Sequence, residues 1–218
     1  MPDNIYESDR LVREYLLFHY GEPDELLPWK FGPRDALGFA RRCVRELIDP
    51  SRLPAVARAL DIGCAVGGAS FELARYCRDV TGIDYSAAFI DAAEKIRTDG
   101  ALDYRYTVEG ERTARAVARA PQCVDGSRIK FAVGDAMALP SDLEQFDVVL
   151  AANLLCRLPD PRAFMARLPS LVKKGGQLLL TTPFTWLEEF TPRENWIGGR
   201  DGAASADELA SFLRPHFK

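Results

Sequence analysis

The chain has 218 residues, 47% of them hydrophobic and 28% charged, which is typical of a globular protein that forms one domain. Its formal net charge of −4 gives no electrostatic basis for binding nucleic acid or a membrane surface. No apolar run reaches the ~20 residues of a membrane span, and the acidic N-terminus lacks the apolar segment of a signal peptide. Five scattered cysteines without a CxxC pair argue against zinc ligation and a disulfide framework. We therefore expect a cytoplasmic protein with reduced thiols and no metal site.

The first fifty residues predict helices. Ser8 is placed to cap a helix that carries four residues at helical spacing, Leu11, Tyr15, Phe18 and His19. Pro33 fits the first turn of a second helix, which Asp49-Pro50 ends. We expect one domain over residues 1–218, in which residues 1–50 form a helical cap on a core spanning residues 55–218.

From residue 55 onward, short apolar strands alternate with amphipathic helices. The strands are predicted at residues 56–62, 80–84, 129–133, 146–151 and 177–182. The helices are predicted at residues 67–76, after Ser86, from Asp160-Pro161, and from a capping box at Ser205-Ala-Asp-Glu208. This alternation predicts an α/β, Rossmann-like fold, in which a mostly parallel sheet has helices on both faces.

Two insertions are too long to be simple connections. Residues 98–128 contain a basic stretch, expected to be helical with a solvated face, that carries Arg112, Arg115 and Arg119. Residues 183–204 follow the last predicted strand and interleave polar residues with two tryptophans. Because ligands of open α/β sheets bind at the carboxyl ends of the strands, we expect residues 183–204 to line a substrate pocket.

A glycine-rich turn after the first strand carries the strongest functional signal. Residues 59–68 read Ala-Leu-Asp-Ile-Gly-Cys-Ala-Val-Gly-Gly, and the second strand ends in Asp84. A dinucleotide site needs G-x-G-x-x-G, with a pyrophosphate at the helix N-terminus. Here Ala65 replaces the middle glycine, and Asp61 would repel a pyrophosphate but suit an ammonium group. An alanine at this position should be tolerated if its φ stays negative.

S-adenosylmethionine fits this pattern because it has no phosphate, an α-amino group, a sulfonium and a ribose with two hydroxyls. Asp61 would face its amino-acid end, and Asp84 would accept both ribose hydroxyls. Asp135 would accept from the adenine amine, and Asn153 would lie next to the reacting methyl. The expected cofactor-binding residues are Asp61, Gly63, Cys64, Ala65, Gly67, Asp84, Tyr85, Asp135, Ala136 and Asn153.

In this order, on four successive strand ends, these features resemble class I SAM-dependent methyltransferases. Residues 4–21, 31–37, 61–67 and 185–196 further resemble the methyltransferase domain of ovothiol synthase, the 4-mercaptohistidine N1-methyltransferase family. This resemblance implies methyl transfer from S-adenosylmethionine to a ring nitrogen of 5-thiohistidine, which gives ovothiol A and S-adenosylhomocysteine. It also implies a sulfoxide synthase as a fused module or partner, because the domain usually follows one in that family.

Methyl transfer is an in-line displacement, so the protein mainly aligns the reactants. A neighbouring hydrogen-bond acceptor would fix the imidazole tautomer. The catalytic candidates, left unranked, are Asn153, Tyr15, His19, Glu188 and Asn195. The substrate-binding candidates are Arg34, Trp186, Glu189, Trp196 and Arg200, with Arg34 or Arg200 for the substrate carboxylate. For His19, a structural role on an apolar helix face is an equal alternative.

Class I methyltransferases normally end in an antiparallel hairpin, which this sequence lacks after its last predicted helix. We therefore expect residues 178–181 to form an unpaired sheet edge that is covered in a homodimer or by residues outside this sequence. The alternative functions are a methyltransferase for another small molecule, such as a carboxylate or amine, and a non-catalytic SAM-binding partner module. Ala65 and Asp135 disfavour a further alternative, an NAD-dependent dehydrogenase.

Overall fold

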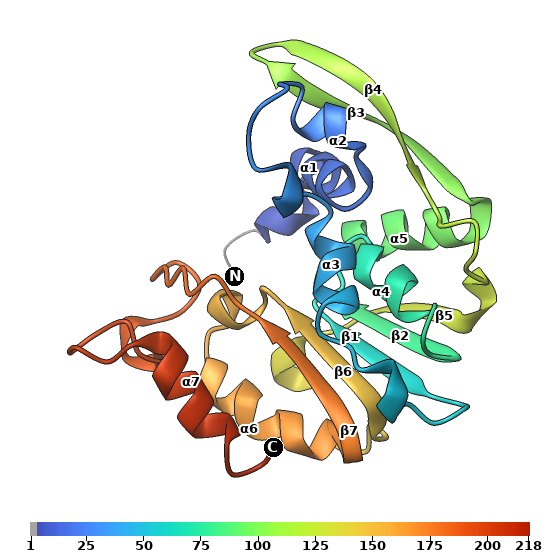
Figure 1. The fold of residues 1–218 in the computed structure, drawn as a ribbon. Helices are drawn as coiled ribbons and strands as arrows, with labels where there is room; N and C mark the ends of the chain where they lie inside the picture. Colours follow the sequence, from blue (N-terminus) through green and yellow to red (C-terminus); the bar gives the residue numbers. More distant parts are fainter. Residues whose placement is uncertain (1–3) are drawn as a thin grey trace.

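The structure, a computed structural model, describes residues 4–218 and is built around a five-stranded parallel sheet (Figure 1). The strand order is β5-β2-β1-β6-β7. The strands are β1 (Arg58–Ile62), β2 (Asp79–Asp84), β5 (Ile129–Val133), β6 (Phe146–Ala152) and β7 (Val172–Thr181). All five predicted strands are present, and the predicted α/β, Rossmann-like fold is confirmed. β7 begins earlier than predicted, because Val172 already pairs with Phe146 before the register shifts.

Helices cover both faces of the sheet. Neighbouring strand residues point to opposite faces, since Ala59 and Val148 belong to one buried cluster while Leu60 and Val149 belong to the other. The first cluster receives side chains from α3 (Phe39–Arg45), α4 (Gly68–Leu73) and α5 (Ala87–Asp99). The second receives side chains from α6 (Pro161–Leu171) and α7 (Ser205–Leu213). Within residues 4–218, none of the helices combines the length and the apolar character needed to cross a membrane.

The N-terminal helices follow the sequence prediction in part. The Ser8 side chain accepts a hydrogen bond from the Leu11 N–H and caps α1 (Asp9–Tyr20), as predicted. A short helix, α2 (Pro23–Leu26), was not anticipated. The predicted second helix starts later than Pro33, at α3, because Gly38 adopts φ 68° and interrupts the backbone before it.

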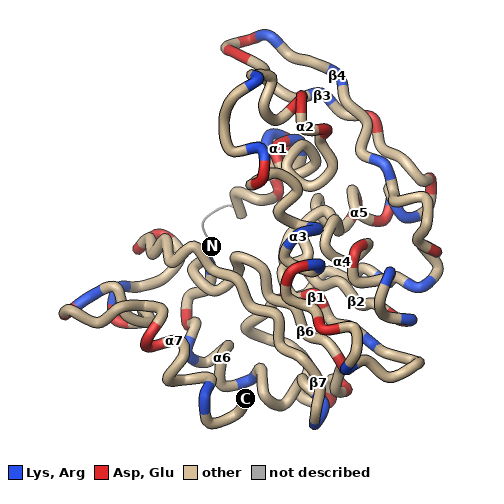
Figure 2. The backbone as a smooth tube through the Cα atoms, viewed as in Figure 1, with Lys and Arg blue, Asp and Glu red and all other residues tan. Residues whose placement is uncertain are grey.

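The insertion after α5 is an antiparallel hairpin, so the predicted basic helix is wrong. Its strands are β3 (Ala101–Glu109) and β4 (Arg112–Arg119), which lie over α1 (Figure 1). Tyr104, Ala116 and Ala118 are buried against the rest of the chain. Its arginines are exposed as predicted, and Figure 2 shows charges of both signs along the hairpin. Burial of every second residue of β4 around Ala116 and Ala118 is the period of a strand and not of a helix.

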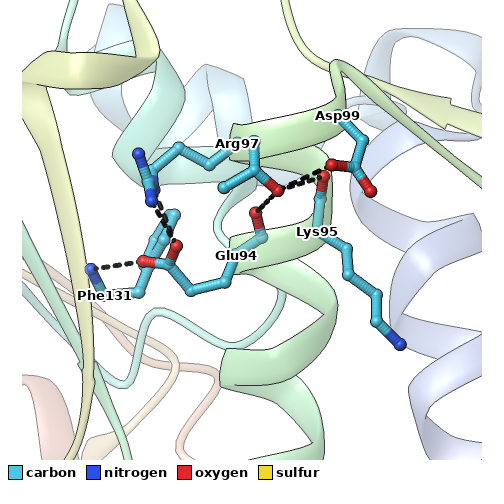
Figure 3. A network of polar contacts seen from close by, with 6 residues as sticks. Glu94, Lys95, Arg97, Asp99 and Phe131 are labelled. Atoms are coloured by element: carbon cyan, nitrogen blue, oxygen red, sulfur yellow. Dashed lines mark hydrogen bonds and ion pairs between the residues drawn. The ribbon is translucent and has the colours of Figure 1, made fainter.

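A carboxylate joins α5 to the sheet (Figure 3). Ser86 caps α5 as predicted, by accepting from the Phe89 N–H at 3.1 Å. One oxygen of Glu94 accepts from the Phe131 N–H of β5 at 3.3 Å, and the other accepts from Arg97 Nε at 2.8 Å. These bonds fix β5 against α5 and hold the Phe131 ring beneath the glycine-rich turn.

The two last helices begin where the sequence predicts, but one cap is different. Asp160 accepts from the Ala163 N–H at 3.0 Å and caps α6 as predicted. α7 begins at Ser205, yet the predicted capping box is wrong because the Ser205 hydroxyl accepts from the Trp186 indole N–H at 3.0 Å. The N-cap position is Ala204, whose side chain has no acceptor.

Candidate functional site

A cavity of about 640 Å³ opens at the carboxyl ends of the strands. It lies where the strand order reverses, between β1 and β6, which is the crevice where open α/β sheets bind ligands. Four strand ends line it, at residues 61–65, 83–85, 134–137 and 152–154. The residues that cover these strand ends are Asn4, Ile5, Tyr6, Tyr15, Phe18, His19, Phe39, Ala40, Glu189 and Phe190.

The glycine-rich turn connects β1 to α4. Gly63 and Gly67 have φ of 76° and 86°, which glycine adopts without steric cost. Ala65 has φ 48°, so the backbone does not meet the condition of a negative φ under which an alanine is free of strain. The left-handed conformation costs a non-glycine residue about 1–2 kcal/mol. It brings the Ala65 N–H to 2.8 Å from Asp84 Oδ2, and this hydrogen bond to a charged acceptor offsets part of that cost.

Asp84 ends β2 and holds two backbone groups of the site. Its Oδ2 accepts from the Ala65 N–H, and its Oδ1 accepts from the Ser86 N–H at 2.9 Å. Each carboxylate oxygen has a second lone pair that remains available to a ligand donor. Burial raises the pKa of Asp84, and the hydrogen bonds from Ser86 and Ala65 oppose this rise. Asp84 can therefore accept two hydroxyl groups while it keeps the turn in place.

Asp61 is the last residue but one of β1 and is 1% exposed. One of its oxygens accepts from the Ser70 hydroxyl at 2.6 Å. Burial raises the pKa of Asp61 to about 7, because the hydrogen bond from Ser70 offsets only part of the lost hydration. An ammonium group in the cavity would favour the ionised carboxylate.

Two residues of α1 support the start of α4. His19 Nδ1 accepts from the Gly68 N–H at 3.1 Å, and the Tyr20 hydroxyl donates to the Val66 carbonyl at 2.7 Å. Burial lowers the pKa of His19 to about 4, so the imidazole is neutral at pH 7. His19 lines the cavity, but its Nδ1 is occupied, and this contact favours the structural alternative given for it above. Burial also raises the pKa of Tyr15, which lines the cavity, to about 12.

The remaining strand ends add two polar side chains. The backbone N–H of Asn153 donates to the Thr181 carbonyl at 2.8 Å, and the Thr181 hydroxyl donates to Asn153 Oδ1 at 3.3 Å. Asp135 accepts from the Met137 N–H at 2.8 Å and is otherwise exposed. Nine of the ten expected cofactor-binding residues line this cavity, and the tenth, Gly67, precedes α4 beside it.

Six other predicted residues do not line this cavity: Arg34, Trp186, Glu188, Asn195, Trp196 and Arg200. The two tryptophans stack on each other, with ring centroids 6.4 Å apart. Asn195 and Arg200 donate to the carbonyls of Pro159 and Glu194, and Arg34 pairs with Asp24. The loop of residues 183–204 contributes only Glu189 and Phe190 to the cavity lining. The six residues stay sequence predictions for the site, without support from the geometry.

Sequence reasoning missed Arg157, Tyr6 and Phe190, which line the cavity. Arg157 lies within the apolar run Leu-Leu-Cys-Arg-Leu after Asn153. A single cation in an apolar run that follows a strand end could have identified it as a candidate site residue. Its guanidinium stacks over the Phe190 ring at 4.8 Å from the ring centroid. Among residues 4–218, no three His, Cys, Asp or Glu side chains cluster as a metal site would require.

A second cavity, of about 490 Å³, lies between the end of α1 and the hairpin. It is lined by residues such as Tyr20, Glu25 and Arg115, and by none of the predicted site residues. The chemistry described above belongs to the larger cavity.

The fold and the site define a class I methyltransferase, the Rossmann-like fold that uses S-adenosylmethionine. Residues 60–180, more than half of the chain, match the family described as "Methyltransferase domain". The chain belongs to this methyltransferase-domain family.

Two similar proteins are named as methyltransferases. A ubiquinone biosynthesis O-methyltransferase of Coxiella burnetii (strain Dugway 5J108-111) is 29% identical over 145 residues, covering 63% of this chain and 51% of that protein. A 2-methyl-6-phytyl-1,4-hydroquinone methyltransferase of Synechocystis sp. is 33% identical over 129 residues, covering 59% of this chain and 32% of that protein. The chain spans about half the length, or less, of these relatives.

Two solved structures resemble parts of this chain at low identity. The [4+2]-cyclase SpnF is 22% identical, with a TM-score of 0.48 over 69% of this chain and 48% of that chain. The CcbJ methyltransferase from Streptomyces caelestis is 19% identical, with a TM-score of 0.47 over 69% of this chain and 54% of that chain.

Proposed function

We propose that this protein transfers the methyl group of S-adenosylmethionine to a small-molecule acceptor. The observation that carries the proposal is the pair of carboxylates, buried Asp61 and half-buried Asp84, at adjacent strand ends of one cavity. Asp84 offers two oxygens to a ribose, and a cation beside Asp61 would stabilise its anion further than the hydrogen bond from Ser70 does. A dinucleotide pyrophosphate would meet both negative charges, whereas S-adenosylmethionine supplies hydroxyls and an ammonium group.

The cavity walls suit an alkyl transfer that needs alignment and exclusion of water. The sulfonium supplies an activated methyl group and a neutral leaving group, so the protein supplies no covalent nucleophile. Tyr15 and Phe89 pack with ring centroids 4.6 Å apart, and Tyr6 packs edge-on against Tyr15 at 6.2 Å. These rings restrict water in the covered half of the cavity and provide flat surfaces for a planar acceptor. Asn153 and Thr181 hold each other at the end of β6 and β7, where we place the reacting atoms.

We propose 5-thiohistidine as the acceptor, with its imidazole nitrogen receiving the methyl group to give ovothiol A. The support is the resemblance of residues 4–21 to the ovothiol family, since Tyr6, Tyr15 and His19 from that segment line the cavity. An oxygen acceptor on a phenol or catechol is the second candidate, because several relatives are named as O-methyltransferases.

The test is to incubate the protein with S-adenosylmethionine and either 5-thiohistidine or 5-thiohistamine, or with 3,4-dihydroxybenzoate or catechol. We expect the mass of 5-thiohistidine to rise by one methyl group, and NMR to place that methyl on the ring nitrogen. Methylation of 3,4-dihydroxybenzoate or catechol alone would refute the imidazole acceptor and support the oxygen acceptor. Tight binding of S-adenosylmethionine without turnover on any of the four compounds would favour a non-catalytic binding module instead.

We further propose that the chain acts as one domain, and that its β7 edge pairs with a second copy. The supporting observation is that, within residues 4–218, β7 pairs with β6 alone. A sulfoxide synthase partner remains a proposal based on the family resemblance.

A further inference from the structure

Arg157 places a positive charge in the cavity without a carboxylate to balance it. Among residues 4–218, it is the only lysine or arginine that lines this cavity, and it forms none of the ion pairs. Its Nη1 donates to the carbonyls of Cys156 and Thr185, at 3.1 and 3.2 Å. These two bonds position the side chain, and the Tyr6 hydroxyl lies within hydrogen-bond reach of the guanidinium.

The guanidinium lies toward the β6–β7 half of the site. Arg157 follows β6 and is tied to Thr185, which follows β7, whereas Asp84 ends β2. β1 stands between β2 and β6 in the sheet. The strand end before the arginine is therefore separated by β1 from the strand end that carries the carboxylate that we assign to the ribose.

Two aromatic rings flank this cation. Arg157 stacks on Phe190, and the Tyr6 and Phe190 rings lie 6.5 Å apart at an interplanar angle of 31°. Burial raises the pKa of Tyr6, and the adjacent Arg157 guanidinium opposes that rise. The Tyr6 phenol is therefore neutral at pH 7 and does not balance the charge of Arg157.

A half-buried guanidinium that has no ion-pair partner is well placed to bind an anionic group of a ligand. Glu189 also lines the cavity, but no ion pair within residues 4–218 joins it to Arg157. The guanidinium has the planar fork that binds a carboxylate through two hydrogen bonds.

We propose that Arg157 binds a carboxylate of the acceptor, which makes the enzyme selective for small planar acceptors that carry an acidic group. The inference rests on the proposed methyltransferase function. It assigns to Arg157 the role that the sequence suggested for Arg34 or Arg200. The methyl donor also carries a carboxylate, so the experiment separates these two sources.

The experiment measures calorimetric binding to the protein loaded with S-adenosylhomocysteine, so no turnover is needed. The ligands are two pairs that differ by a carboxylate: 5-thiohistidine with 5-thiohistamine, and 3,4-dihydroxybenzoate with catechol. The variants are Arg157→Gln, Arg157→Lys and the control Arg162→Gln, an exposed arginine that also donates to a backbone carbonyl. Arg157→Lys keeps the positive charge and loses the planar guanidinium that binds a carboxylate through two hydrogen bonds. It replaces Arg157→Gln in the test if that variant fails to fold.

We expect the carboxylated member of at least one pair to bind the natural protein about tenfold or more tightly than its partner. Arg157→Gln removes this preference, Arg157→Lys reduces it, and Arg162→Gln retains it. The affinity for S-adenosylhomocysteine changes less than about twofold in every variant.

Three outcomes overturn the inference. The first is that the natural protein shows no carboxylate preference in either pair, and the second is that the preference persists in the Arg157 variants. The third is that Arg157→Gln weakens the binding of S-adenosylhomocysteine about tenfold, which would assign Arg157 to the donor carboxylate. A preference seen only in the catechol pair refutes 5-thiohistidine as the acceptor and retains the role of Arg157. Failure of the protein to bind S-adenosylhomocysteine refutes the proposed function and, with it, this inference.

Discussion

Asp61 and Asp84 line one cavity but have different partners. Asp84 accepts two backbone N–H groups, while Asp61 has a single hydroxyl donor and is almost wholly buried. Two backbone donors favour the ionised form of Asp84, whereas burial of Asp61 favours its neutral form. Asp84 is therefore suited to hold hydroxyls, and Asp61 to respond to a cation.

Asp84→Ala should weaken the binding of S-adenosylmethionine by more than about tenfold, because two hydrogen bonds to a charged acceptor are lost. Calorimetry measures the change. Asp79→Ala, at the exposed opposite end of β2, is the matched control and should leave the affinity unchanged. An unchanged affinity in Asp84→Ala would remove that residue from the site.

The raised pKa of Asp61 makes ligand binding depend on pH. With a pKa of about 7, the free protein holds a proton on Asp61 below pH 7, and a ligand ammonium displaces it. The Kd of S-adenosylhomocysteine should fall roughly tenfold between pH 6 and pH 8. Asp61→Asn should bind more weakly and without this dependence. A flat pH profile for the natural protein would show that no ammonium group meets Asp61.

The same group links stability to pH in the ligand-free protein. Between about pH 4 and pH 7 the folded chain holds a proton on Asp61 that the unfolded chain has released. The free energy of unfolding should therefore fall as the pH rises through this window, and Asp61→Asn should lessen the fall. Urea titrations at several pH values measure it, and the same slope in both proteins would contradict the assignment.

At the residue scale, the sequence predicted the side chains at strand ends and missed those brought in by packing. Asp61, Asp84 and Asn153 follow apolar runs directly, so their position is a consequence of the parallel sheet. Tyr6 and Arg157 reach the cavity through tertiary contacts that no local period records. The φ of Ala65 depends on a hydrogen bond to Asp84, which is also non-local.

At the element scale, strands and helix starts were predictable, while the insertion and one cap were not. Ser8, Ser86 and Asp160 cap helices as predicted, because the bond joins neighbours in sequence. The hairpin was mistaken for a helix because the arginine spacing of three and four residues matches a helical face. Ser205 lost its predicted role because Trp186, distant in sequence, donates to the same hydroxyl.

Gly67 permits both the turn and the close approach of Phe131 to it. A Cβ at Gly67 would lie 2.6 Å from Phe131 Cζ, and the residue has φ 86°. Gly67→Ala should lower the free energy of unfolding by about 2–4 kcal/mol, the sum of backbone strain and overpacking.

The control is Gly100→Ala, which has a similar φ of 77° but no described atom within 4 Å of the new Cβ. It should cost about 1–2 kcal/mol from backbone strain alone. Chemical denaturation of both variants separates the cost of backbone strain from the cost of overpacking. Equal losses of unfolding free energy in the two variants would show that Phe131 moves freely.

At the scale of the whole molecule, the N-terminal segment and the sheet form the cavity together. The Glu7 carboxylate accepts from the Ala87 and Ala88 N–H groups at 2.8 and 3.1 Å, and Ser86 donates to the Tyr6 carbonyl at 2.9 Å. The cover over the site is thus hydrogen-bonded to the start of α5, next to Asp84. Binding of the donor should therefore depend on the N-terminal segment as well as on the sheet.

The β7 edge predicts association of the 218-residue chain. Leu178 and Leu180 lie on a strand that, within residues 4–218, has a partner on one side only. Exposed edges of this kind pair with other strands unless they are blocked. Sedimentation velocity should give twice the mass of one chain, and a monomer at all concentrations would contradict the proposed dimer.

The most direct test is a crystal structure of the protein with S-adenosylhomocysteine bound. We predict that both ribose hydroxyls lie within hydrogen-bond distance of the Asp84 carboxylate, and that the ligand ammonium lies on the Asp61 side of the glycine-rich turn. A ligand seated elsewhere, or one whose ribose and ammonium group turn away from these two carboxylates, would contradict the proposed donor site.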